Sequence, residues 1–198
     1  LFALRLSDAH LAAGNAAAAR DALERAIPLA AQGATLRDRL AELYRSAGEW
    51  GKLADLIAEA VAHEADPVAR GARLREAADL HWKRRNDPVA AIPFLQQAAD
   101  LAPEDSALRR ELATVLIAGG RMEEAATALR AVIAAYGTRR PKDRALAHFE
   151  LARVTLATGD RPVAVSELDL ALKIDPANPE ILQTLARLAL EEGQLDRA

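Results

Sequence analysis

The sequence predicts an all-α protein made of stacked antiparallel helix-turn-helix repeats. Two observations predict this fold class. Helix-favouring residues dominate the 198 residues, with 48 Ala and 30 Leu, whereas aromatic residues make up only 4%. A glycine also recurs at intervals of 34, 72, 39 and 34 residues, with similar small and apolar residues around it each time. Such recurrence is typical of a chain that repeats one hairpin unit.

The recurring glycine is predicted to end the first helix of each unit. Its positions are Gly14, Gly48, Gly120, Gly159 and Gly193, and Asn86 holds the same place in the longest interval. Glycine takes the left-handed backbone conformation without a Cβ penalty, and asparagine is its usual replacement. A small or apolar residue follows five positions later, at Ala19, Leu53, Ala91, Ala125, Ala164 and Ala198. Small side chains there allow the two helices of a hairpin to approach closely.

Prolines are predicted to mark the ends of second helices, at Asp66-Pro67, Ala102-Pro103 and Asp175-Pro176, because proline cannot continue a helix. An extra residue lies near Lys83-Arg84-Arg85-Asn86, and an added loop is expected at Gly137–Lys142. The expected units are 1–33, 34–68, 69–105, 106–144 and 145–178, with a partial sixth at 179–198. We expect them to form a single array over residues 1–198 that is a fragment of a longer protein.

This pattern resembles the tetratricopeptide repeat family over essentially the whole chain. The shared features are a Leu-Ala pair in the first helix, such as Leu40-Ala41 or Leu112-Ala113, the turn glycine, and the small residue opening the second helix. Leu172–Pro179 is close to the family's repeat-end sequence. The resemblance implies a right-handed superhelical solenoid whose first helices line a concave groove. It also implies a protein–protein interaction scaffold that binds a peptide or a partner helix in that groove.

The family frame places a set of charged, polar and apolar side chains in the groove. The residues expected to contact a partner are Glu42, Arg45, Arg75, Asp79, Lys83, Arg110, Thr114, Phe149, Arg153 and Arg187. Arg153 and Arg187 hold equivalent places in successive units, and a guanidinium beside an apolar wall suits a peptide carboxylate. The alternative is that these arginines are solvated or pair with carboxylates nearby. The Lys and Asn clamp with which chaperone adaptors of the family hold an acidic tail is absent, so tail binding is not expected.

Two short basic clusters lie outside this set, at Lys83-Arg84-Arg85 and around Arg139, Arg140 and Lys142. Each is either a solvated turn or a docking point for an acidic partner. Trp82 is expected to be buried, and Trp50 is expected to pack between repeats.

Composition and motifs argue against other function classes. The chain has no cysteine, no phosphate-binding or nucleophile motif, and no histidines at metal-ligand spacing, so we expect no enzyme, metal or cofactor. The net charge of −3 and the acidic groove residues oppose nucleic-acid binding. No apolar stretch is long enough for direct membrane insertion. A cytoplasmic location is favoured, and the true N-terminus is expected upstream because the chain opens at Leu1 without Met.

Two alternatives to peptide binding stay open. One is self-association through an uncapped C-terminal end of the array, because a solenoid end without a polar cap exposes an apolar face. The other is a structural or regulatory segment of a larger multidomain protein.

Overall fold

The computed structural model describes residues 1–30 and 33–191. Over these ranges the backbone forms eleven α-helices, a short 3-10 turn η1 (Ile27–Leu29) and a π-helical turn η2 (Leu80–Arg84), and it contains no β-strand. The prediction of an all-α fold is therefore confirmed. The chain divides into two compact units, unit 1 (Leu1–Asp87) and unit 2 (Pro88–Ala198).

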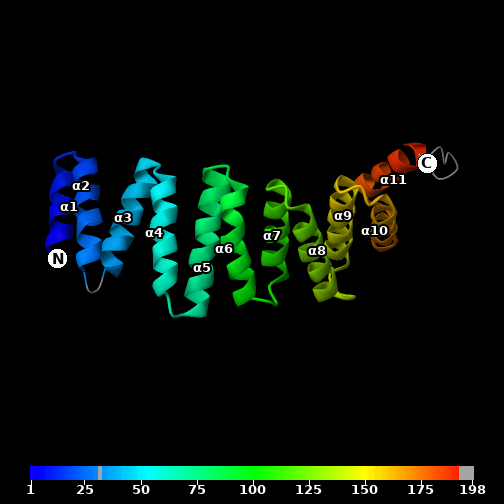
Figure 1. Cartoon of the computed structure of the whole chain (residues 1–198), viewed down its shortest axis with the longest axis horizontal. Coiled ribbons are helices and arrows are strands. Elements are labelled where there is room, and N and C mark those ends of the chain that lie inside the picture. Colours follow the sequence, from blue (N-terminus) through cyan, green and yellow to red (C-terminus); the bar gives the residue numbers. More distant parts are fainter. Residues whose placement is uncertain (31–32, 192–198) are drawn as a thin grey trace. The chain divides into compact units, whose positions relative to one another are not determined.

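Unit 1 contains two helix hairpins followed by the first helix of a third (Figure 1). Its α-helices are α1 (Phe2–Ala12), α2 (Ala16–Ala26), α3 (Ala34–Ala47), α4 (Trp50–His63) and α5 (Pro67–Asp79). Each helix packs on the next one along the chain. Helices that follow one another therefore bury each other's apolar stripes, as expected of hairpins joined by short turns.

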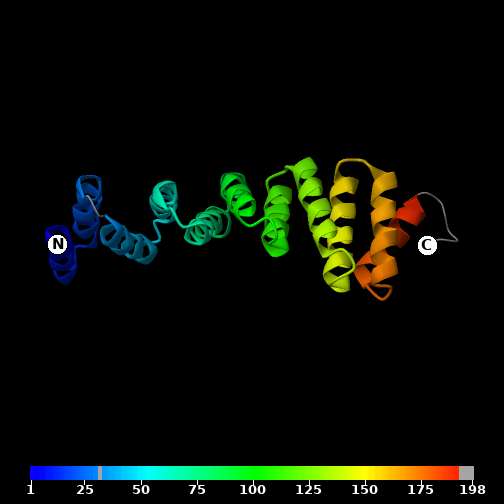
Figure 2. The same ribbon diagram turned by 90° about the horizontal axis from the view of Figure 1, so that it is seen from below.

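Unit 2 continues the same alternation of helices and tight turns. Its α-helices are α6 (Pro88–Leu101), α7 (Ser106–Ala118), α8 (Met122–Tyr136), α9 (Pro141–Ala157), α10 (Arg161–Ile174) and α11 (Pro179–Glu191). Helices α8, α9 and α10 lie side by side in both views (Figures 1 and 2). Helix α9 is therefore covered on two sides.

Two helices begin before the borders expected between units. Helix α5 begins at Pro67 instead of 69, because the Asp66 carboxylate caps its first turn and proline suits the first helical position. Helix α9 begins at Pro141, because proline again suits the first helical position. The loop expected at Gly137–Lys142 is therefore shorter by two residues. The border between units 1 and 2 falls inside the predicted third repeat, and a single array over residues 1–198 stays a prediction.

The turn glycines have the predicted left-handed backbone. Gly14, Gly48, Gly120 and Gly159 have φ values of 73°, 70°, 75° and 86°, and Asn86 has a φ of 52°. At Gly48 the turn is closed by two hydrogen bonds, from Gly48 N–H to the Arg45 carbonyl (3.2 Å) and from Glu49 N–H to the Tyr44 carbonyl (3.0 Å). The prediction of a helix end at each of these positions is confirmed, whereas Gly193 and Ala198 lie outside the described residues.

The extra residue of the third hairpin is absorbed by the π-helical turn η2. Arg85 N–H donates to the Leu80 carbonyl at 3.1 Å, five residues back, instead of the usual four. The wider turn accommodates one more residue while Leu74, Ala77 and Ala78 of the preceding helix stay buried.

Small residues fill the tight contact inside each hairpin. Ala19, Ala91, Ala125 and Ala164, each five residues after a turn glycine or Asn86, are completely buried. Long aliphatic side chains complete the two cores, among them Leu23, Leu40, Leu53 and Leu74 in unit 1 and Leu108, Leu129, Leu151, Leu168 and Ile181 in unit 2. Trp82, expected to be buried, is only half-buried, as is Trp50.

Candidate partner-binding surface

The residues predicted to contact a partner all lie on first helices of hairpins or on η2. They are Glu42 and Arg45 on α3, Arg75 and Asp79 on α5, Lys83 on η2, Arg110 and Thr114 on α7, Phe149 and Arg153 on α9, and Arg187 on α11. Because units 1 and 2 are separate compact bodies, each carries its own part of the predicted surface. Nine of these residues are exposed or half-buried, and Phe149 is buried.

In unit 1 the predicted residues take part in ion pairs within and between first helices. Arg39 of α3 donates to Asp8 of α1 (Nη2–Oδ1, 2.9 Å) and to Glu42 (Nη1–Oε2, 3.0 Å). These hydrogen bonds, to Glu42 first and Asp8 second, raise the pKa of Arg39. Glu42 is thus already engaged by a neighbouring arginine.

The same pattern repeats on the next helices of unit 1. Arg45 of α3 donates to Glu76 of α5 (Nη2–Oε1, 2.5 Å), and Lys83 pairs with Asp79 (Nζ–Oδ1, 2.6 Å). Arg75 lies exposed on α5. A partner that used Arg45 or Lys83 would have to displace a carboxylate that is already bound.

In unit 2, Arg110 of α7 forms a two-pronged hydrogen bond with Glu150 of α9. Its Nε lies 3.2 Å from Oε2 and its Nη2 lies 2.9 Å from Oε1. These bonds to Glu150 raise the pKa of Arg110. Thr114, one turn further along α7, is exposed and donates its hydroxyl to the Arg110 carbonyl at 3.0 Å.

Phe149 is a core residue and does not belong to an exposed surface. Its side chain is 5% exposed and packs in a cluster with Ala152, Leu168 and Ile181. The physical reason is that α9 lies between α8 and α10, so side chains on most of its circumference are buried. The apolar wall expected beside Arg153 is therefore part of the packing between helices.

Arg153 and Arg187 remain as exposed cations on the first helices of unit 2. Neither forms an ion pair with any residue that the structure describes. On α11, Gln183, Arg187 and Leu190 share one helix face through their spacing of four and three residues, and Leu190 is 57% exposed. We call Thr114, Arg153, Gln183, Arg187 and Leu190 the arginine surface of unit 2.

Three residues that hold neighbouring first helices together were not predicted from the sequence, namely Arg39, Glu76 and Glu150. The sequence spacing could have indicated two of the three ion pairs. Asp8 and Arg39 are 31 residues apart, and so are Arg45 and Glu76. Opposite charges separated by slightly less than one repeat can meet across adjacent first helices.

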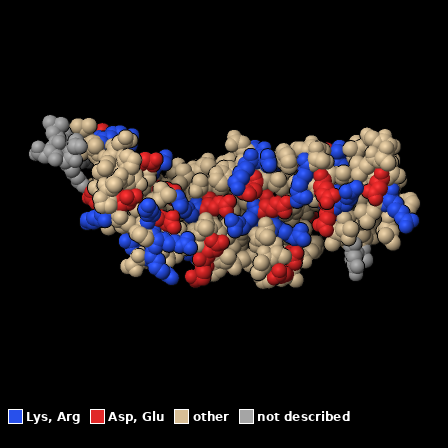
Figure 3. All heavy atoms as spheres, turned by 180° about the vertical axis from the view of Figure 1, so that it is seen from behind, with Lys and Arg blue, Asp and Glu red and all other residues tan. Residues whose placement is uncertain are grey.

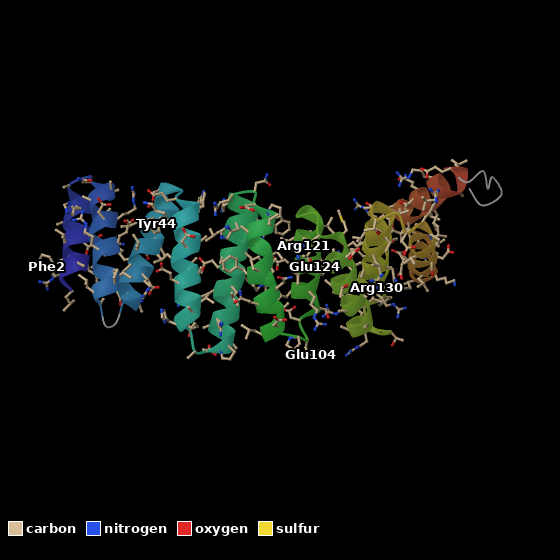
Figure 4. The ribbon with its side chains drawn as sticks, in the orientation of Figure 1. Phe2, Tyr44, Glu104, Arg121, Glu124 and Arg130 are labelled. Carbon is tan, nitrogen blue, oxygen red and sulfur yellow. The ribbon has the colours of Figure 1, made fainter. Side chains whose placement is uncertain are left out.

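Charged side chains of both signs lie close together on the surface (Figure 3). Figure 3 shows acidic and basic side chains intermixed over one face of the molecule. Figure 4 shows one such local pair, Arg121 and Glu124 at the start of α8. Among residues 1–30 and 33–191, no three His, Asp or Glu side chains are grouped so that they could hold a metal ion. No helix in the described part is both long enough and apolar enough to cross a lipid bilayer.

Comparison with known proteins supports the repeat assignment. Residues 84–148 match the family model described as tetratricopeptide repeat. Over 106 residues the chain is 32% identical to the cellulose synthase operon protein C of Pseudomonas fluorescens (strain SBW25). This match covers 54% of the chain and 8% of the length of that relative.

Solved structures show the same fold at low sequence identity. YrrB, described as a TPR protein with an unusual peptide-binding site, is 20% identical, with a TM-score of 0.56, and the match covers 92% of this chain and 89% of YrrB. A putative kinesin light chain with nearly identical TPR-like repeats from Podosopora anserina is 22% identical, with a TM-score of 0.54 and coverages of 87% and 92%. The chain therefore has the tetratricopeptide repeat fold, and its residues 84–148 match the model of that family.

Proposed function

We propose that the chain binds a peptide or a partner helix on the arginine surface of unit 2. The observation that carries this proposal is that Arg153 and Arg187 stand exposed and without an ion pair among the described residues, whereas Arg39, Arg45 and Arg110 are engaged by carboxylates. A guanidinium that is not neutralised offers planar, bidentate donors to a carboxylate of a partner.

The neighbouring groups suit a polypeptide ligand. Leu190 supplies apolar area next to Arg187 on α11, and Gln183 on the same face can donate and accept hydrogen bonds. A binding surface that combines apolar contact with a few directed polar groups is typical of helix and peptide recognition. The described peptide-binding site of YrrB, a protein of the same fold, supports a peptide as the class of ligand.

The test is a selection of peptides from a random displayed library against the whole chain, followed by titration calorimetry of the selected peptide. Arg153→Glu with Arg187→Glu should weaken binding at least tenfold, because two donors become repelling carboxylates. The helical circular dichroism should be unchanged, because both side chains are exposed.

A matched control places the same charge change on second helices of the same unit. Arg130 on α8, labelled in Figure 4, and Lys173 on α10 are both exposed. Arg130→Glu with Lys173→Glu should leave the affinity within about twofold of the unmodified chain. Equal losses in the two double variants would mean that only net charge matters, and unchanged affinity in Arg153→Glu/Arg187→Glu would remove the arginine surface from the proposal.

Self-association is a second candidate, favoured by exposed apolar side chains in each of the two units. Phe2, labelled in Figure 4, is 80% exposed and Leu29 is 87% exposed in unit 1, whereas Leu182 and Leu190 are exposed on α11. Apolar faces of this kind associate when a complementary face is available. Light scattering over a concentration series should show association that Phe2→Ser with Leu29→Ser reduces, and a constant monomer mass would refute this candidate.

A further inference from the structure

Arg84, the last residue of the π-helical turn, and Arg85, the residue after it, lie against the start of another helix in unit 1. The Cζ of Arg84 is 5.0 Å from the centroid of the Trp50 ring. The guanidinium of Arg85 lies beside Gly51, where a Cβ would come within 3.9 Å of its Cζ and Nε. Arg84 ends η2, whereas Trp50 and Gly51 form the first turn of α4. The widened turn described above thus brings two cations to a neighbouring hairpin.

Uncharged groups hold these arginines in place. The Trp50 ring attracts the Arg84 guanidinium through its π face. Arg85 Nη1 lies 3.0 Å from His81 Nδ1. Burial first, and the Arg85 charge second, lower the pKa of His81 against the opposing charges of Asp87 and Asp55, which favours the neutral ring whose Nδ1 can accept the hydrogen bond. The two arginines are thus held by the Trp50 ring and the His81 ring.

Other cations near this point are already paired with carboxylates. Lys83 binds Asp79 at 2.6 Å, and Lys52 binds Glu49 at 3.0 Å. Glu49 also accepts from Arg20 at 3.0 Å, so its charge is compensated. Neither Arg84 nor Arg85 forms an ion pair with a residue in the described part of the chain, and both side chains are exposed. Their charge is therefore available to a ligand from outside.

A shallow hollow lies beside these side chains. It is lined by Gly48, Glu49, Trp50, Gly51, Lys52 and Arg85. Gly51 leaves the floor open, because no side chain projects from it toward Arg85. A guanidinium with one face against an aromatic ring keeps its N–H edges free for carboxylate oxygens.

We propose that Arg84 and Arg85 form a docking site for an acidic peptide segment on unit 1, separate from the arginine surface of unit 2. Charge complementarity identifies the occupant: two adjacent, pre-oriented guanidiniums fit two carboxylates of one acidic stretch. Pre-orientation by Trp50 and His81 lowers the ordering cost of binding. Within the basic cluster Lys83-Arg84-Arg85, the proposed docking role therefore belongs to Arg84 and Arg85.

The test uses the full chain and a hexaglutamate peptide as probe, measured by titration calorimetry at low salt. Arg84→Gln with Arg85→Gln should weaken binding at least about tenfold, because charge-assisted hydrogen bonds are lost. The only two tryptophans of the chain, Trp50 and Trp82, are at or next to the site, so hexaglutamate should also change the intrinsic fluorescence. Gly51→Glu, which places a carboxylate beside Arg85, should weaken binding while both arginines stay in place.

The matched control is Arg139→Gln with Arg140→Gln, which makes the same charge change in unit 2. These two arginines line a hollow that also contains the carboxylates Glu104 and Asp105, so they should contribute little to binding of an acidic probe. Affinity of this control within about twofold of the unmodified chain supports the proposal. The proposal is refuted if the unmodified chain does not bind hexaglutamate, if both double variants lose affinity equally, or if inorganic phosphate at equal concentration displaces the peptide.

Discussion

Arg110 on α7 and Glu150 on α9 are joined by two parallel hydrogen bonds of 2.9 and 3.2 Å, and this pair ties two successive hairpins of unit 2 together. Both side chains are about three-quarters shielded from solvent, with exposures of 28% and 23%. A two-pronged pair with this burial is stronger than an ordinary surface ion pair. Arg110 therefore has a structural role in the scaffold, and its contact with a partner stays a prediction.

Glu150→Gln should lower the free energy of unfolding by about 1–2 kcal/mol, because the half-buried Arg110 loses its charged acceptor. Urea unfolding followed by helical circular dichroism measures the change. Glu104, labelled in Figure 4, is exposed in the turn before α7, and Glu104→Gln should change stability by less than about 0.5 kcal/mol. Equal effects of the two substitutions would contradict a structural role for the pair.

Ser7→Ala should raise the stability by about 1 kcal/mol. The Ser7 side chain is completely buried, and its hydroxyl has no hydrogen-bond partner among the described residues. Ala41, Ala113 and Ala152 hold the equivalent position in other hairpins. Removal of an unsatisfied buried hydroxyl relieves its desolvation cost. Thermal unfolding should show a higher midpoint for Ser7→Ala and no change for the exposed Ser166→Ala.

Two glycine-to-alanine substitutions in unit 1 should change the free energy of unfolding in opposite directions. Gly14 has a φ of 73°, so Gly14→Ala forces a left-handed alanine and should cost about 1–2 kcal/mol. Gly71 lies inside α5, so Gly71→Ala should stabilise by about 0.5–1 kcal/mol. At both positions an added Cβ meets no atom within 4 Å, so the difference is one of backbone conformation alone. Chemical denaturation of both variants checks the sign.

The stability of unit 1 should fall as the pH drops below about 6.5 because of His81. Burial and the Arg85 charge lower its pKa from the ordinary 6.5, so the unfolded chain binds a proton at a higher pH than the folded chain does. The stabilisation by neutral His81 is complete above the pKa that His81 has in the unfolded chain. It decreases as the pH falls toward the lower pKa of His81 in the folded chain. Unfolding monitored by tryptophan fluorescence between pH 7.5 and 5 should show this loss. His81→Asn, which offers a non-titrating acceptor, should flatten the profile, and an unchanged profile would exclude His81 as its source.

The helix hairpins could be predicted from the sequence because their causes are local. Gly14, Gly48 and Gly159 take a left-handed turn conformation that few other residues tolerate. Asn86 could be aligned with the glycines by the same argument. The burial of the small residues after each turn could also be predicted, since a short turn requires close contact between the two helices. The helix starts at Pro67 and Pro141 were not predicted, because a proline between two helices is compatible with the end of one helix and with the first position of the next.

The candidate site depended on contacts that local sequence does not contain. Whether Arg45 or Arg110 is free depends on Glu76 and Glu150, which lie on the next first helix, and the burial of Phe149 depends on α8 and α10 packing on both sides of α9. The sequence by itself determined the helices, their turns and the identity of the repeat, because backbone preference and apolar periodicity act over a few residues. Only the tertiary structure decided which charged side chains are already paired, because ion pairs and burial form between helices about one repeat apart in the chain.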